Sequence, residues 1–201
     1  MNLPPHQIVE AISAQELKNR VDELVEEIHA KCLPGHTGEN PEKTVVSNNL
    51  VIVGVLRGSF MFLADLVRSL NRHRLHPRID FMTLSSYGGG TQSSGNVRIL
   101  KDVSVDLEGA DVLLVDDILD SGRTLRFAVR HIENKGARRV MTCCLLDKPA
   151  RRAVDIQADF RGFEIPDVFV VGYGLDYDSH YRELPYIGNV IHEKAATTSG
   201  S

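Results

Sequence analysis

The stretch that decides the fold is VLLVDDILDSGRTL, residues 112–125. Its apolar first part predicts a buried strand, which leads to the two carboxylates Asp116 and Asp117. The segment TLRFAVRHIENKGA, residues 124–137, has helical spacing and a terminal glycine stop. A strand, an acidic turn and a helix in direct succession are typical of an α/β protein.

The same succession appears on both sides of this stretch. Apolar or β-branched runs predict further strands at residues 50–56, 79–85, 139–146 and 168–174, with a hairpin strand at 97–103. Helical spacing predicts helices at residues 13–32 and 57–73, the first opened by a capping box of Ser13 and Glu16. Together they predict an α/β fold with a mostly parallel sheet, helices on both faces, and ligands bound at the carboxyl ends of the strands.

Composition excludes several classes of protein. The 201 residues carry 23 Lys plus Arg against 27 Asp plus Glu, a net charge of −4, which disfavours a nucleic-acid partner. No apolar run approaches the roughly 18 residues of a membrane span. The three cysteines form neither a disulfide framework nor a zinc motif, and the N-terminus lacks a secretory pattern, so we expect reduced thiols and a cytoplasmic protein. The tail at 195–201 is expected to be disordered.

The turn after Asp117 has the chemistry of a phosphate site. Amides at a helix start, with Gly122 permitting close approach and hydroxyls at Ser121 and Thr124, form a cradle for a phosphate dianion. Neighbouring carboxylates accept hydrogen bonds from ribose hydroxyls or hold a divalent metal. The alternative is ordinary turn and cap chemistry, which Asp also serves. The full pattern favours a sugar-phosphate site.

This pattern resembles the phosphoribosyl-pyrophosphate signature of the type I phosphoribosyltransferases. LRGSF (56–60), SSYGGG (85–90), LLDKPARR (145–152), GFEIPDVFVVGYGLDY (162–177) and YRELPYIG (181–188) are similar, in order and spacing, to the hypoxanthine or hypoxanthine-guanine phosphoribosyltransferases. The resemblance covers about residues 8–192 and implies one domain at 1–194. Its core would span about 45–147, with a small hood from the N-terminal segment and about 148–192.

The resemblance implies purine salvage: transfer of the 5-phosphoribosyl group from phosphoribosyl pyrophosphate to N9 of hypoxanthine and guanine, with Mg²⁺, by a homodimer or homotetramer without nucleic-acid or membrane partners. Asp120 would be the catalytic group near purine N7. The residues implied to bind the ribose, its 5-phosphate and the metal are Asp116, Asp117, Ser121, Gly122, Arg123 and Thr124. As neighbours on a strand, the first two would point to opposite faces unless the chain turns there.

The remaining implied roles concern the purine and pyrophosphate. Those for the purine are Lys148 donating to O6, Phe169 stacking on the ring, Val170 binding its edge, and Asp176 near the 2-position or a second Mg²⁺. Those for pyrophosphate are Arg57, Gly58 and Arg182, with the Leu56–Arg57 peptide often cis in the family. Ser86 and Tyr87 would belong to a mobile lid.

Two residues depart from the family pattern, and the sequence leaves the place of one arginine pair and two alternative functions undecided. Asp116 stands where the family often has Glu, and Arg57 where many relatives have Lys. The neighbouring Arg151 and Arg152 either close the purine side or face solvent. The first alternative function is a regulator that senses phosphoribosyl pyrophosphate without catalysis. The second is a sister enzyme that prefers xanthine or guanine.

Overall fold

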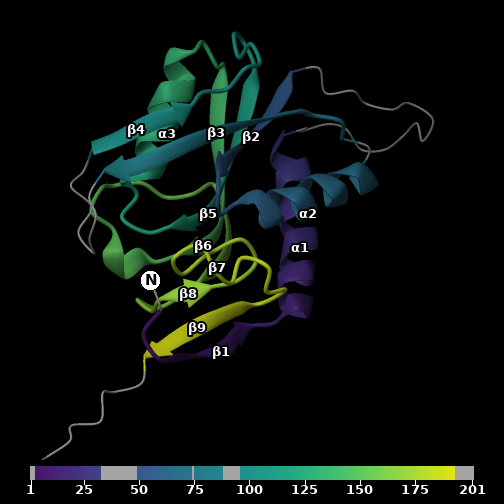
Figure 1. The fold of residues 1–201 in the computed structure, drawn as a ribbon. Helices are drawn as coiled ribbons and strands as arrows, with labels where there is room; N and C mark the ends of the chain where they lie inside the picture. Colours follow the sequence, from purple (N-terminus) through teal and green to yellow (C-terminus); the bar gives the residue numbers. More distant parts are fainter. Residues whose placement is uncertain (1–2, 33–48, 74, 88–95, 193–201) are drawn as a thin grey trace, which may run out of the picture.

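The computed structural model describes residues 3–32, 49–73, 75–87 and 96–192. The glycines that follow Ser86 and Tyr87 in the SSYGGG stretch, residues 88–90, and the expected disordered tail at 195–201 lie outside these residues. Figure 1 shows two sheets, a large one and a small one that lies below the ends of the large sheet's strands.

The large sheet has six strands, in the order β4-β3-β2-β5-β6-β7. Their bounds are β2 Leu50–Leu56, β3 Arg78–Tyr87, β4 Asn96–Lys101, β5 Asp111–Leu119, β6 Arg139–Asp147 and β7 Phe160–Glu164. All neighbours are parallel except β4, which returns antiparallel along β3 as the expected hairpin. The predicted α/β fold with a mostly parallel sheet is therefore confirmed.

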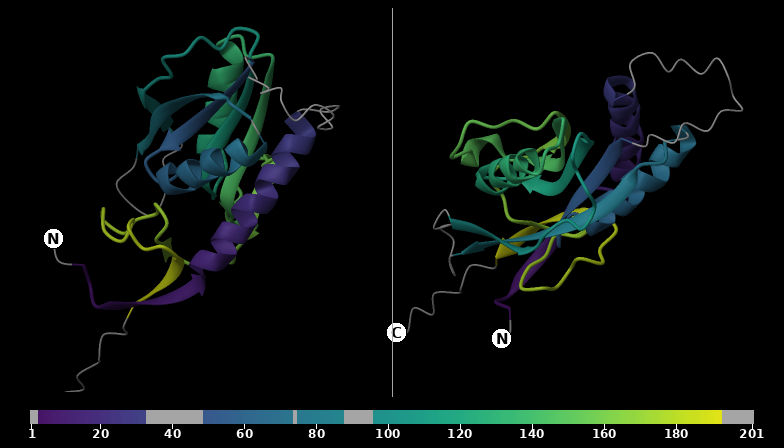
Figure 2. Two further views of the ribbon diagram at one scale, coloured as in Figure 1. Left: turned by 90° about the vertical axis from the view of Figure 1, so that its right-hand side faces the viewer. Right: turned by 90° about the horizontal axis from the view of Figure 1, so that it is seen from above.

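The helices cover both faces of this sheet. Their bounds are α1 Ala14–Cys32, α2 Phe60–Leu70 and α3 Arg123–Asn134, with 3-10 turns η1 at Asn71–His73 and η2 at Pro149–Arg151. Figure 2 shows α1 and α2 on one side of the sheet and α3 on the other. Two apolar clusters follow this division, one packed under α1 and α2 and one under α3. Among the described helices, none is both long and apolar enough to cross a membrane.

Local sequence signals explain several of these elements. At the start of α1, the Ser13 amide donates to Glu16 Oε2 at 2.8 Å and the Glu16 amide donates to Ser13 Oγ at 3.3 Å, which confirms the capping box. Adjacent strand residues face opposite sides, so Cys143 packs in the cluster under α1 and α2 and Cys144 in the one under α3. Both thiols are free and buried, and burial raises the pKa of each.

The small sheet is antiparallel and has the order β1-β9-β8, with β1 at His6–Ile12, β9 at Ile187–His192 and β8 at Val170–Val171. The residue pattern predicts neither β1 nor β9, nor β7 of the large sheet. β7 follows residue 147, where the expected core ended, yet it pairs with β6. The small sheet lies beyond the carboxyl ends of the large sheet's parallel strands, because Lys148, just after β6, reaches the carbonyl of Val168, just before β8.

Candidate active site

The candidate site lies where three neighbouring parallel strands end. β2, β5 and β6 run in the same direction and end at Leu56, Leu119 and Asp147, so the segments that follow them share one edge of the sheet. These segments carry the predicted residues 57–58, 120–124 and 148. The structure thus brings together residues far apart in sequence, at the edge where open α/β sheets bind ligands.

Gly122 shapes the turn between β5 and α3. Its φ is +81°, in the left-handed region that favours glycine, and it is the N-cap of α3. A Cβ there would lie 2.6 Å from Ile156 Cγ2 and 3.0 Å from Val154 Cγ2. The Arg123 amide donates to Ser121 Oγ at 3.4 Å. Ser121 and Thr124 are half-buried on the same turn, so the predicted phosphate cradle forms the start of a helix.

Asp116 and Asp117 lie inside β5 rather than at its end. The strand continues to Leu119, so the chain does not turn at the two acids. Each carboxylate bends along the chain instead: Asp116 Oδ1 accepts the Asp117 amide and Asp117 Oδ1 accepts the Ile118 amide, each at 3.0 Å. Pairing of β5 with β2 has by then stopped, at Val115. The side chains take up amides where the ladder ends.

The loop after β2 packs directly on the second of these acids. A Cβ at Gly58 would lie 1.6 Å from Asp117 Oδ2, so only glycine permits this approach. Burial and then repulsion from Asp117 raise the pKa of Asp116 well above its usual range. Burial also raises the pKa of Asp117, although the neighbouring Arg182 acts in the opposite direction. Two close, buried carboxylates repel each other when both are ionised, and a nearby positive charge would stabilise them.

A divalent cation would supply this positive charge. Oxygen donors are the ligands that Mg²⁺ prefers, and it keeps several waters or substrate oxygens beside one or two carboxylates. Among the described residues, no third His, Cys, Asp or Glu joins the pair in a metal-ligating cluster. Asp116 and Asp117 therefore fit Mg²⁺ if the remaining ligands come from a bound substrate and from water.

Asp120 is the predicted catalytic residue, and it lies at the entrance to the turn. Its Oδ1 atom is buried and has no hydrogen-bond partner within the part of the chain that the structure describes. Arg151 Nε lies 3.2 Å from this oxygen as an ion pair, without the alignment of a hydrogen bond. A buried carboxylate oxygen with no donor is costly. The rest of the Asp120 side chain is open, at 41 % exposure, so the carboxylate is suited to accept a proton or a hydrogen bond from a ligand there.

Lys148 is almost fully buried, which is unusual for lysine. Its Nζ donates to the Val168 carbonyl at 2.5 Å. Burial lowers the pKa of Lys148, while the negative charges of Asp120 and Asp167 act in the opposite direction. Lys148 therefore interacts with the charge of Asp120 and contacts the segment before Phe169. It lies between the predicted base and the predicted stacking ring.

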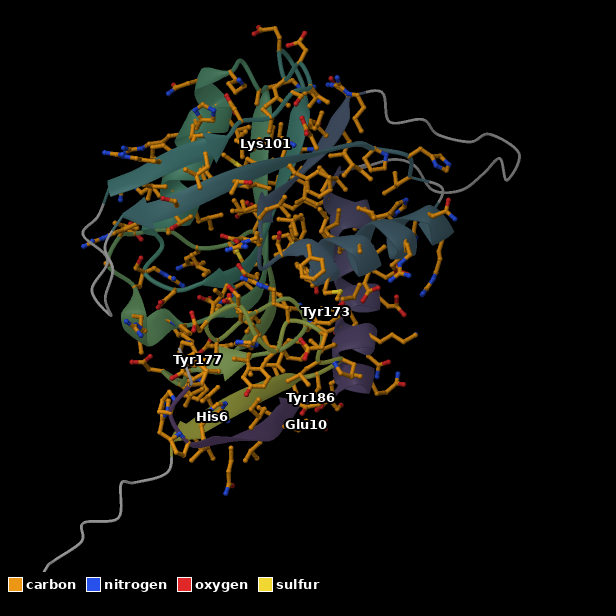
Figure 3. All side chains as sticks on the ribbon, viewed as in Figure 1. His6, Glu10, Lys101, Tyr173, Tyr177 and Tyr186 are labelled. Atoms are coloured by element: carbon orange, nitrogen blue, oxygen red, sulfur yellow. The ribbon has the colours of Figure 1, made fainter. Side chains whose placement is uncertain are left out.

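Phe169 leaves half of its surface open, at 49 % exposure, while Val170 is buried in β8. The Phe169 ring meets Tyr177 edge to face, and Tyr177 also contacts His6 of β1. Figure 3 shows Tyr177 and His6 close together at one end of the small sheet. An exposed aromatic face held in place at its edge is suited to stack on a planar ring. Sequence reasoning missed Tyr177 and His6.

Asp176 and Arg182 form the ends of a tight hairpin after β8. Arg182 Nη2 lies 2.6 Å from Asp176 Oδ1, and its Nη1 donates to the Gly174 carbonyl at 2.5 Å. Asp176 Oδ2 also accepts the Ser179 amide at 2.7 Å. At Gly174, with φ +104°, a Cβ would lie 2.1 Å from the carbonyl oxygen of Gly58. This hairpin therefore places Arg182 beside the 57–58 loop and Asp117.

The other predicted residues lie at the same edge or at its border. Arg57 is exposed, and the Leu56–Arg57 peptide is cis, as the resemblance implied. Ser86 and Tyr87 are the last residues of β3, where they pair with Val97 and Asn96. The sequence does not decide whether Arg151 and Arg152 face the purine side or solvent. In the structure both contact the site: Arg151 pairs with Asp120, and Arg152 donates to the backbone carbonyls of Leu119 and Asp120.

Comparison with known proteins agrees with this arrangement. Residues 9–178 match the phosphoribosyl transferase domain family. The chain is 46% identical over 189 residues to the hypoxanthine phosphoribosyltransferase of Buchnera aphidicola, covering 94% of this chain and 99% of that protein. It is 44% identical over 186 residues to the Escherichia coli hypoxanthine phosphoribosyltransferase, covering 92% and 97%.

Solved structures give the same result. A hypoxanthine-guanine phosphoribosyltransferase from Bacillus anthracis superposes with a TM-score of 0.79 at 40% identity, covering 92% of this chain and all of that one (100%). A Trypanosoma cruzi hypoxanthine phosphoribosyltransferase variant, solved as a ternary substrates complex, gives 0.78 at 39% identity, covering 94% and 96%. Sequence, fold and site geometry agree, and the chain belongs to the hypoxanthine phosphoribosyltransferases of the type I phosphoribosyltransferase family.

Proposed function

We propose that this protein transfers the 5-phosphoribosyl group of phosphoribosyl pyrophosphate to N9 of hypoxanthine, and of guanine as a second substrate, in purine salvage. The observation that carries the proposal is the buried Oδ1 of Asp120, which lacks a hydrogen-bond donor in the described part of the chain. A purine N7–H is a donor that the open side of this carboxylate accepts, because the Asp120 side chain is 41 % exposed. Asp120 accepts or shares that proton while N9 becomes the nucleophile.

In the reaction, the bond from C1′ to the pyrophosphate oxygen breaks and the bond from C1′ to N9 forms. The ribose ring gains positive charge in between, and the buried carboxylates of Asp116 and Asp117 stabilise it while holding the ribose hydroxyls. The turn of Ser121, Gly122, Arg123 and Thr124 holds the 5-phosphate through its amides and hydroxyls. Bound Mg²⁺ supplies positive charge that neutralises the departing pyrophosphate.

The purine is selected by three neighbouring groups. Lys148 donates to O6 of a 6-oxopurine, whereas adenine presents an amino donor at that position and is rejected. The open face of Phe169 stacks on the ring, and the backbone of Val170 binds its edge. Asp176 lies near the purine 2-position or holds a second Mg²⁺. Its ion pair with Arg182, 2.6 Å long, links the purine side to the pyrophosphate side.

Pyrophosphate binds to Arg57, to the amide of Gly58 and to Arg182. The close approach of Gly58 to Asp117 supports this, because it places the 57–58 loop over the carboxylates. Ser86 and Tyr87, at the end of β3, belong to a lid whose closure excludes water from the cationic ribose.

We also propose a cytoplasmic enzyme, consistent with the free thiols of Cys143 and Cys144. We expect a homodimer or homotetramer.

The proposed function is tested by an ultraviolet absorbance assay with phosphoribosyl pyrophosphate and Mg²⁺, in which hypoxanthine, guanine, xanthine and adenine are offered separately. We expect rapid nucleotide formation from hypoxanthine, slower or equal formation from guanine, no reaction with adenine, and loss of activity on chelation. Preference for xanthine would instead identify a sister enzyme. Binding of phosphoribosyl pyrophosphate without turnover of any base would identify a sensor.

A further inference from the structure

Arg152 joins the ends of two neighbouring strands through one guanidinium group. Its Nη1 donates to the carbonyl oxygen of Leu119 at 3.0 Å and to that of Asp120, and its Nη2 donates to the carboxylate of Asp147. The side chain is only 17 % exposed, so these contacts are largely shielded from water. The acceptors at 119 and 120 belong to the approach to the turn after β5.

The next residue continues this set of contacts. The Ala153 amide donates to the carbonyl of Ser121 at 2.9 Å, so the carbonyls of Leu119, Asp120 and Ser121 are all held by residues 152–153. In a trans peptide the carbonyl and the following N–H point in opposite directions. The amides of Asp120, Ser121 and Gly122 therefore point away from residues 152–153. Successive amides aimed to one side form an anion-binding nest.

Packing fixes the same segment under the turn. A Cβ at Gly122 would lie 3.2 Å from Arg152 Cδ, in addition to its contacts with Val154 and Ile156. Residues 152–156 thus form a floor on which the turn rests. The floor is anchored in turn by the buried Asp147, which also accepts from Arg161 Nη1 at 3.3 Å.

We propose that Arg152 is a positioning residue for the 5-phosphate of the substrate. It aims the amides of Asp120 and Ser121 by holding the carbonyl ends of their peptide groups, without touching the phosphate. This inference rests on the proposed function, which places the 5-phosphate at residues 121–124. A guanidinium serves because it offers several donors in a fixed plane, whereas a lysine ammonium cannot reach three acceptors in that arrangement.

The test compares two ligands that differ only in the 5-phosphate, namely inosine 5′-monophosphate and inosine. Their dissociation constants are measured by calorimetry with the wild type, Arg152→Gln and Arg152→Lys. We expect Arg152→Gln to weaken binding of the nucleotide about tenfold or more, with inosine binding unchanged, and Arg152→Lys to recover little of the loss. In steady-state assays the KM for phosphoribosyl pyrophosphate rises while the KM for hypoxanthine stays the same.

Arg161→Gln is the matched control. Arg161 pairs with the same Asp147 but is half-exposed and donates to none of the turn carbonyls within the described chain. We expect wild-type affinity for both ligands. If Arg152→Gln does not fold, as judged by circular dichroism, Asp147→Asn takes its place, because it removes the anchor of Arg152 and is expected to reduce nucleotide affinity in the same direction.

The outcomes separate this inference from the proposed function. Equal losses of nucleotide and nucleoside binding, or no loss in a folded Arg152→Gln variant, would overturn the positioning role while leaving the proposed function intact. A wild-type protein that does not bind the nucleotide at all would overturn the proposed function and this inference with it.

Discussion

The ring of Phe169 meets the ring of Tyr177 edge to face, with centroids 5.3 Å apart and planes inclined at 68°. Tyr177 makes similar contacts with His6 and His192, at 5.4 Å and 5.9 Å. These two histidines face each other across the β1–β9 pair. The proposed purine-stacking ring is therefore supported by side chains from both ends of the described chain.

Replacing Tyr177 by Leu is expected to weaken purine binding. Removing an edge-to-face contact costs about 0.5–1.5 kcal/mol, so the KM for hypoxanthine should rise roughly two- to tenfold. The KM for phosphoribosyl pyrophosphate should stay the same, because Tyr177 does not belong to the turn after β5. Tyr177→Phe keeps the ring and serves as the control. Equal KM values for hypoxanthine in the wild type and Tyr177→Leu would exclude this supporting role.

Asp120→Asn is expected to lower turnover strongly while leaving binding of phosphoribosyl pyrophosphate largely intact. The amide keeps the size of the side chain but no longer accepts a proton at purine N7. A loss of about 10²–10⁴-fold in kcat is typical when a general base is removed. Calorimetric titration with phosphoribosyl pyrophosphate and Mg²⁺ provides the control. Unchanged kcat would rule out Asp120 as the base.

Lys148→Met is expected to affect capture of the purine rather than of the ribose. A hydrogen bond from a charged donor contributes about 1.5–3 kcal/mol, so the KM for hypoxanthine should rise by about one to two orders of magnitude. The melting temperature should not fall, because burial already disfavours the charged lysine and lowers its pKa. A variant with a normal KM for hypoxanthine would show that O6 is recognised elsewhere.

Asp116→Asn is expected to make the free protein more stable and the enzyme less active. Burial and repulsion from Asp117 raise the pKa of Asp116, so ionising this carboxyl costs more in the folded protein than in the unfolded chain. Removing that charge should stabilise the fold by on the order of 1 kcal/mol, a rise in Tm of roughly 2–4 °C. Phosphoribosyl pyrophosphate with Mg²⁺ should raise the Tm of the wild type more than that of the variant. A lower Tm in the free variant would contradict this.

The lowered pKa of Asp22 on α1 predicts that the free energy of unfolding falls at acid pH. The hydrogen bond from Ser69 on α2, opposed by partial burial and helped by Arg72 and Lys18, lowers its pKa from 3.8 to about 2. Because the folded-state pKa is the lower one, the contribution is complete above pH 4 and disappears as the pH falls toward 2. The charged partners of Asp22 are exposed, Arg72 by 58 % and Lys18 by 60 %, so screening limits the contribution to about 1 kcal/mol.

Asp22→Asn tests this through urea unfolding at several pH values. The variant should be less stable than the wild type at pH 6, and the two should converge near pH 2. A difference that stayed constant over this range would show that the charge of Asp22 is not the cause. Lys18→Gln is a milder companion, because Lys18 is 60 % exposed and contacts Asp22 at 3.2 Å.

Much of the large sheet could be predicted because its signals are local. The apolar run of β2, the capping box at Ser13 and Glu16, and the glycine stop after α3 each act within a few residues. The acidic segment at 116–124, which is the end of β5 and the turn after it, could be found in the same way. Its residues are contiguous, and the chemistry of a phosphate cradle demands those residue types in that order.

The elements that the sequence did not reveal depend on distant partners. β1 and β9 lack a clean alternation of buried and exposed residues. They form strands because they pair with each other, from His6 with His192 to Ile12 with Ile187. Arg152 resembles any surface arginine until the fold places the Leu119 and Asp120 carbonyls beside it. The continuation of β5 past Asp117 follows from pairing with β6, which no local pattern encodes.

The β1–β9 pairing also has a consequence for the order in which the protein matures on the ribosome. All strands of the large sheet lie between Leu50 and Glu164, so they are synthesised before β9. Until Ile187–His192 emerges, β1 has no neighbour along that edge, and the support of Phe169 is incomplete. A nascent chain should therefore complete the large sheet, with the proposed phosphate-binding turn, before the proposed purine-binding side, which requires β9. In the interval it carries an unpaired strand that is open to association with other chains.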